Sequence, residues 1–156
     1  MSKGKKGEMR IVRTVTVVAL REPDVDFTRH TTTNTADRGE DLNLRAPSNL
    51  GEKFEDIIKY GKTDIQSSDK KINIRIDGKN KKADKDDVEK FVDDIKKNPG
   101  SDEHWLIYQD ISKPGRQVIN DAKQVFTKPI RTFSFDEILK VEQSYSALEE
   151  YDENKE

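Results

Sequence analysis

The fold is decided by the stretch Ile72-Asn73-Ile74-Arg75-Ile76-Asp77-Gly78-Lys79, near the middle of the chain. Its three isoleucines alternate with polar residues, which is the period of a strand that buries one face. Asp77 and Lys79 are two positions apart, so on an extended strand their side chains point to the same side. The stretch therefore predicts a half-buried strand that ends in an acid and an amine with a common orientation.

Composition limits what kind of protein surrounds this strand. The chain has 156 residues, of which 31% are hydrophobic and 38% charged, with a net charge of −2 and no cysteine. The length suits one domain, and the lack of cysteine excludes disulfides and thiolate metal sites. No run of about 18 apolar residues is present, so we expect no membrane span and no secretion. We expect an intracellular protein of the cytoplasm or nucleus, with a single domain over 9–140, a flexible basic tail at 1–8 and an acidic tail at 141–156.

Local patterns predict strands and helices on both sides of the central stretch. Apolar residues at helical spacing predict helices after a cap at Ser48 or Asn49, after a cap at Asp84 or Asp86, from Pro114, and over 136–148. Runs of β-branched or alternating apolar residues predict further strands over 9–20, 25–33, 41–44, 63–66, 105–108 and 130–135. The resulting order predicts an α/β fold: a mixed central sheet flanked by helices, with an extra β segment on its N-terminal side.

Asp64 adds a second acid to the pair at the end of the central strand. It lies 77 − 64 = 13 positions before Asp77, on the partner strand of a predicted hairpin. Two carboxylates brought together in this way suit Mg²⁺ or Mn²⁺, which prefer oxygen ligands. A lysine beside such an ion can orient or deprotonate an attacking water. Asp64, Asp77 and Lys79 are therefore the predicted catalytic set, with the two aspartates as metal ligands.

These motifs resemble the PD-(D/E)xK nuclease superfamily. The likeness lies in Thr63-Asp64, in Ile76-Asp77-Gly78-Lys79 and in the helical segment that begins at Asp87-Val88. It is strongest with the restriction-endonuclease-like branch that includes Mrr-type enzymes and Holliday-junction resolvases, and it covers the core at 50–139. The resemblance implies a restriction-endonuclease-like fold and a hydrolase that cuts DNA phosphodiester bonds with a metal-activated water. Nucleases of this branch often pair, so it also implies a homodimer.

The chain departs from the family pattern at its first acid. Thr63 stands where the family name implies proline. Asp41, in the segment Gly39-Glu40-Asp41-Leu42, also resembles the family's first acid, and its choice would make 45–71 an insertion before the second strand. We expect Asp64 in this role, because its spacing to Asp77 is compact, and we keep Asp41 as the alternative metal ligand.

Two further features are implied by the same resemblance. Residues 9–45 have no counterpart in the family and are expected to form an N-terminal β extension of the core. Family members often add a glutamate from the first helix. Glu52 or Glu55 would fill this role here, with Glu55 as an additional metal ligand.

A local basic face accompanies the central strand. Because the net charge is negative, a contact with nucleic acid has to come from such a face. Seven basic residues fall within 16 positions: Lys70, Lys71, Arg75, Lys79, Lys81, Lys82 and Lys85. Those expected to contact DNA, with RNA as an open alternative, are Arg75, Lys81, Lys82 and Lys85. The competing interpretation is a solvated face of a lysine-rich surface.

Other functions fit the same sequence. Asp77 and Lys79 can form an ordinary exposed ion pair of little energetic consequence. The domain would then be a catalytically inactive nuclease-fold module that contacts DNA or serves as a structural subunit. Residues 141–156 carry six acids against one lysine. This imbalance favours a protein-interaction partner that acts through an acidic surface.

Overall fold

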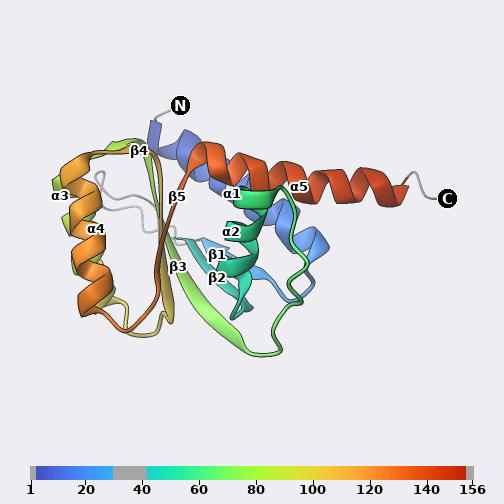
Figure 1. Cartoon of the computed structure of the whole chain (residues 1–156), viewed down its shortest axis with the longest axis horizontal. Coiled ribbons are helices and arrows are strands. Elements are labelled where there is room, and N and C mark those ends of the chain that lie inside the picture. The colour runs from blue at the N-terminus through green and yellow to red at the C-terminus, as the bar shows by residue number, and fades with distance from the viewer. Residues whose placement is uncertain (1–2, 30–41, 154–156) are drawn as a thin grey trace.

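The structure, a computed structural model, describes residues 3–29 and 42–153. A five-stranded mixed sheet lies at their centre. The elements in chain order are α1 (Lys3–Arg21), β1 (Asp26–Arg29), β2 (Leu42–Pro47), α2 (Leu50–Tyr60), β3 (Lys71–Ala83), α3 (Lys85–Lys97), β4 (Glu103–Ile111), α4 (Lys113–Val125), β5 (Ile130–Ser134) and α5 (Phe135–Glu153). The strands lie in the order β1-β2-β3-β4-β5, with β1, β2 and β3 antiparallel and β3, β4 and β5 parallel. The predicted α/β class, a mixed sheet flanked by helices, is confirmed (Figure 1).

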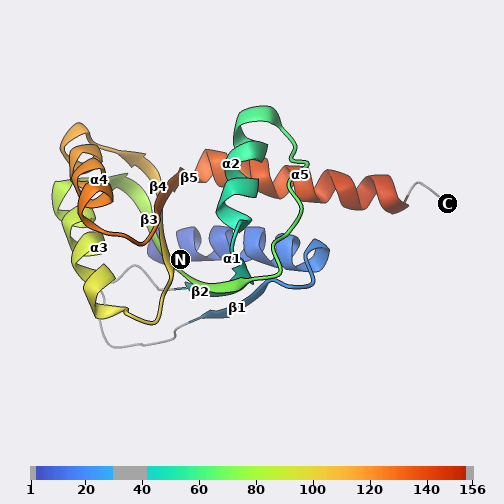
Figure 2. The same ribbon diagram turned by 60° about the horizontal axis from the view of Figure 1, so that its bottom comes forward.

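Helices cover both faces of this sheet (Figures 1 and 2). One core cluster joins the sheet to α1, α2 and α5, and a second joins it to α3 and α4. The period of two in β3 places Ile72, Ile74 and Ile76 in the first cluster. In β4, Trp105 belongs to the first cluster and Leu106 to the second. Strand β4 is therefore buried on both faces, as expected of a central strand with parallel neighbours.

Residues 9–20 form most of helix α1, so the strand predicted there is wrong. Their β-branched residues favour a strand by propensity. However, Ile11, Val15 and Val18 recur at spacings of four and three and are buried together. Helix propensities of such residues differ from that of alanine by only about 0.7 kcal/mol or less, so burial of a continuous apolar face against β3 and α5 outweighs them.

The antiparallel partner of β3 is β2 and not the segment 63–66. Residues 61–70 contain no strand, so the predicted hairpin is wrong. The predicted tails also differ from the structure, because α1 already begins at Lys3 and α5 continues to Glu153.

The remaining elements lie close to their predicted positions. The strand predicted over 25–33 is β1, and residues 30–33 lie outside the described part of the chain. Gly61 ends α2 with a φ of 81°, the left-handed conformation that glycine adopts without strain. Asp84 caps α3 in a reciprocal capping box with Asp87.

A buried pair, Arg75 and His104, links β3 to β4 beneath α3. Arg75 Nε donates to His104 Nδ1 at 2.9 Å, and Arg75 Nη2 donates to the carbonyl of Phe91 at 3.0 Å. The guanidinium also lies over the Phe91 ring, 4.7 Å from its centroid. Burial, together with the positive charges of Arg75 and Lys128, lowers the pKa of His104 to about 4. His104 is therefore neutral at pH 7 and accepts a hydrogen bond through Nδ1.

We expect this pair to make the fold sensitive to mild acid. His104 of the unfolded chain takes up its proton near pH 6.5, whereas the folded chain does so near pH 4, so the unfolded state binds more protons in between. The contribution of His104 to the free energy of unfolding should fall by about 2 kcal/mol from pH 7 to pH 5. Urea unfolding at the two pH values measures this change. The matched variant is His104→Asn, whose amide oxygen can accept from Arg75 but does not titrate. An equally steep loss in both proteins would contradict the assignment.

Candidate functional site

Asp77 and Lys79 lie where β3 continues beyond β2. The outermost described pair between these strands joins Leu42 to Ile76, so Asp77 is the first residue of β3 past that pair. Asp77 is 5% exposed and Lys79 is half-buried. The carboxylate is thus enclosed and the amine partly accessible, in a part of β3 that remains paired with β4 as far as Ala83.

The acid and the amine share one face of the sheet. In the parallel ladder, Asp77 pairs with Leu106 and Lys79 pairs with Tyr108. Leu106 and Tyr108 belong to the core cluster under α3 and α4. Because paired residues of neighbouring strands point to the same face, Asp77 and Lys79 point to the α3–α4 side.

Helix α1 crosses β3 next to this pair. A Cβ on Gly78 would lie 2.6 Å from Ile11 Cδ1, and one on Gly7 would lie 2.7 Å from Asn80 Cβ. Helix and strand therefore approach each other so closely that these two positions leave no room for a Cβ without a shift of the neighbouring atoms. Glu8, which follows Gly7, is only 9% exposed. The sequence interpretation missed this carboxylate, because it did not predict a helix at the N-terminus.

Glu55, the expected glutamate from the first helix, belongs to a different network. Its carboxylate accepts from Arg131 Nη1 at 2.8 Å. Arg131 Nε also donates to Glu103 at 3.2 Å, and Trp105 Nε1 donates to the same Glu103 oxygen at 2.6 Å. This network connects α2 to β4 and β5. The expected metal ligation by Glu55 has no support in its contacts, and Glu52 is exposed in the first turn of α2.

Asp64 does not meet Asp77. It lies exposed in the loop between α2 and β3, where it lines a surface hollow with Asp56 and Tyr60. Helix α2 belongs to the core cluster of α1 and α5, on the face of the sheet opposite to that of Asp77. The sheet therefore separates the two carboxylates, and the predicted pairing of Asp64 with Asp77 is wrong.

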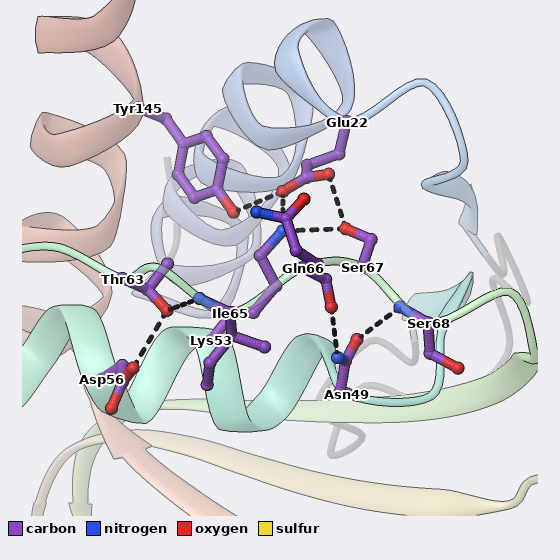
Figure 3. A network of polar contacts seen from close by, with 10 residues as sticks. All are labelled: Glu22, Asn49, Lys53, Asp56, Thr63, Ile65, Gln66, Ser67, Ser68 and Tyr145. Atoms are coloured by element: carbon purple, nitrogen blue, oxygen red, sulfur yellow. Dashed lines mark hydrogen bonds and ion pairs between the residues drawn. The ribbon is translucent and has the colours of Figure 1, made fainter.

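The loop that carries Asp64 is held by a polar network, which Figure 3 shows. Lys53 forms an ion pair with Glu22 and donates to Ser67 Oγ at 2.8 Å. Glu22 also accepts from Ser67 Oγ at 3.1 Å and from the Tyr145 hydroxyl at 3.0 Å. Burial, with Glu22 beside it, raises the pKa of Tyr145. The network ties α1, α2, the loop and α5 together.

A cavity of about 630 Å³ borders this network. Glu22 and Lys53 line it, but they neutralise each other and are hydrogen-bonded. The contacts of the network are those of a structural brace.

The basic residues expected at DNA divide into two groups. Lys82 and Lys85 are exposed. Lys81 is also exposed and pairs with Asp87 at 3.0 Å, and this hydrogen bond raises the pKa of Lys81. Arg75 is fully buried between β3, β4 and α3, so its expected contact with DNA is wrong.

The described residues do not by themselves complete a metal site. Within 3–29 and 42–153, no three His, Asp or Glu side chains are grouped so that they could hold a metal ion. Asp77 offers one carboxylate, the donor type that Mg²⁺ and Mn²⁺ prefer. Asp41, the alternative first acid, lies outside the described residues and immediately precedes Leu42 in the sequence.

No family model, curated protein or solved structure matches the chain. Within the described residues, none of the helices is both long and apolar enough to cross a membrane. The function therefore has to be argued from the chemistry of the site.

We expect the brace around Glu22 to contribute strongly to stability. Lys53→Met removes one partner of a buried ion pair and leaves the Glu22 carboxylate without its counter-charge, which should cost about 3 kcal/mol or more. The matched control is Lys71→Met, because Lys71 pairs with Asp24 through side chains that are 41% and 56% exposed. That change should cost less than about 1 kcal/mol. Urea unfolding of both variants compares them, and equal midpoints would contradict the structural importance of the brace.

Proposed function

We propose that the chain is a metal-dependent nuclease that hydrolyses DNA phosphodiester bonds, with Asp77 and Lys79 at its centre. The observation that carries the proposal is the position of this pair. An acid and an amine share one face of β3 at the level where β2 begins. Asp41 precedes β2 by one residue in the sequence. We therefore assign the first acid to Asp41 in place of Asp64.

The order of the elements supports a restriction-endonuclease-like fold. The elements in chain order are α1, β1, β2, α2, β3, α3 and β4, in which β1, β2 and β3 are antiparallel neighbours, α3 is a crossover helix and β4 is parallel to β3. The hairpin that carries the acid and the Asp-x-Lys pair would be β2–β3, with α2 as an insertion between its strands. Residues 9–45 would then supply part of the core, where the sequence predicted an extension.

The residues of the site would share three tasks. A Mg²⁺ or Mn²⁺ ion bound there supplies a Lewis acid that activates water and offsets charge on the phosphate. Asp77 and Asp41 would hold the ion. Lys79 would orient the attacking water on the face that it shares with Asp77. The exposed basic residues that would meet the DNA backbone, with an affinity that falls as salt rises, are Lys81, Lys82 and Lys85.

A catalytically inactive module with the same fold is the second candidate. It is favoured by the finding that the described residues contain no complete metal-binding group. Titration calorimetry with Mn²⁺ separates the two functions. Binding that disappears in Asp77→Asn supports the nuclease, whereas no binding by the parent chain supports the inactive module.

We expect Asp77→Asn and Lys79→Met each to lower the rate of Mg²⁺-dependent DNA cleavage by at least about 100-fold. Mutation of residues that only orient a metal ligand already lowers metal affinity or activity by about 10- to 100-fold, so loss of a ligand itself should lower activity at least as much. Cleavage of a supercoiled plasmid and of a labelled duplex measures the rate, and EDTA should abolish it.

Asp64→Asn is the matched control, because it removes the same charge from the opposite face of the sheet. It should cleave as fast as the parent chain. If Asp64→Asn were inactive while Asp77→Asn stayed active, the site assigned here would be wrong. Thermal unfolding of each variant verifies that its fold is intact.

A further inference from the structure

Arg116, in the first turns of α4, is held by two hydroxyl groups. Its Nη1 donates to Thr132 Oγ1 at 2.9 Å, and its Nη2 donates to the Tyr108 hydroxyl at 2.5 Å. The guanidinium carbon lies 5.8 Å from the centroid of the Tyr108 ring. The side chain is half-buried. The head group is therefore fixed in position by contacts from β4 and β5.

The contacts of Arg116 differ from those of Arg131, a half-buried arginine of β5. Arg131 lies between two carboxylates, Glu55 at 2.8 Å and Glu103 at 3.2 Å. Within the described residues, no carboxylate forms an ion pair with Arg116, whose partners are neutral hydroxyls. A partly desolvated cation without a counter-charge is unfavourable unless an anion joins it. The arrangement favours a binding site for an external anion.

Tyr108 connects Arg116 to the candidate nuclease site. Tyr108 is the partner of Lys79 in the β3–β4 ladder, and the two side chains share the α3–α4 face of the sheet. Asp77 lies two residues before Lys79 on that face. Lys79 and Arg116 therefore both neighbour Tyr108, and the acid lies one step further along the strand.

We infer that Arg116 binds a backbone phosphate of the nucleic acid, next to the phosphate attacked at Asp77 and Lys79. The inference rests on the proposed nuclease function. A guanidinium has five N–H donors, of which Thr132 and Tyr108 engage two, so it can still donate to phosphate oxygens. Arg116 acts as a positioning residue: it fixes the register of the strand and does not take part in bond cleavage.

The test compares Arg116→Gln with Lys123→Gln, both in a chain that carries Asp77→Asn so that bound DNA is not cut. Lys123 lies in the last turn of the same helix and is exposed, so its substitution removes the same charge at the far end of α4. Binding of a fluorescein-labelled DNA duplex is measured between about 50 and 200 mM salt. Loss of one phosphate contact should make the slope of log K against log salt less negative by about 0.9. Affinity at the lowest salt should fall roughly tenfold or more, and Lys123→Gln should change neither quantity.

Arg116→Lys is a second variant that distinguishes a lost phosphate contact from a loss of DNA affinity caused by misfolding. It retains the charge but not the fork that bonds both hydroxyls, so its salt slope should equal that of the parent while its affinity falls. Duplexes with and without a 5′-phosphate distinguish a backbone phosphate from a terminal one, and equal affinities for both support the backbone contact.

The outcomes separate this inference from the proposed function. If Asp77→Asn binds DNA and Arg116→Gln leaves the salt slope unchanged, the phosphate contact is wrong and the nuclease proposal stands. If Arg116→Gln makes the slope less negative but the parent chain cuts no DNA with Mg²⁺, the phosphate contact stands and the catalytic proposal fails.

Discussion

The close contact between α1 and β3 sets the geometry of the whole domain. It depends on Gly7 of α1, where a Cβ would lie only 2.7 Å from Asn80 Cβ of β3. Because the helix lies directly on the strand, the isoleucines of β3 are sealed into one core cluster, and the intervening residues are directed to the opposite face. Asp77 and Lys79 are among these residues. The packing of α1 on β3 therefore also determines which face of the sheet carries the acid and the amine.

Buried charge is handled in two different ways in this structure. Around Glu22 and around Glu103, each cation has a carboxylate partner, and the networks tie helices to the sheet. Around Arg75, the guanidinium donates to a neutral imidazole and to a backbone carbonyl. Enclosed, hydrogen-bonded groups of this kind suit a structural role. Arg116, half-buried and bonded to hydroxyls alone, differs from them, and its partner Tyr108 pairs with Lys79 in the β3–β4 ladder.

Local patterns in the sequence predicted those helices and strands in which the spacing of apolar residues matches the face that is buried. The strand at 72–77 and the helix capped by Asp84 are examples, because alternation and helical spacing each report one buried face. Helix α1 could not be predicted from propensity, since its β-branched residues favour the other state until β3 and α5 cover them. The spacing of Ile11, Val15 and Val18 was the available signal.

The candidate site could be predicted only in part, because strand pairing is not local. The pair at Asp77 and Lys79 follows from spacing within one strand. Nothing near Asp64 in the sequence reveals that β3 pairs across α2 with β2, so the predicted pairing of Asp64 with Asp77 was wrong. Arg75 was expected at DNA because alternate residues of a half-buried strand face solvent, but α3 covers that face.

Anomalous diffraction from crystals grown with MnCl₂ tests the central claim most directly, because it locates the ion itself. The account predicts a single strong peak at about 2.2 Å from a carboxylate oxygen of Asp77, and no peak there in crystals of Asp77→Asn. A fully occupied Mn²⁺ site elsewhere in the chain, with the Asp77 carboxylate in contact with protein atoms alone, would contradict it.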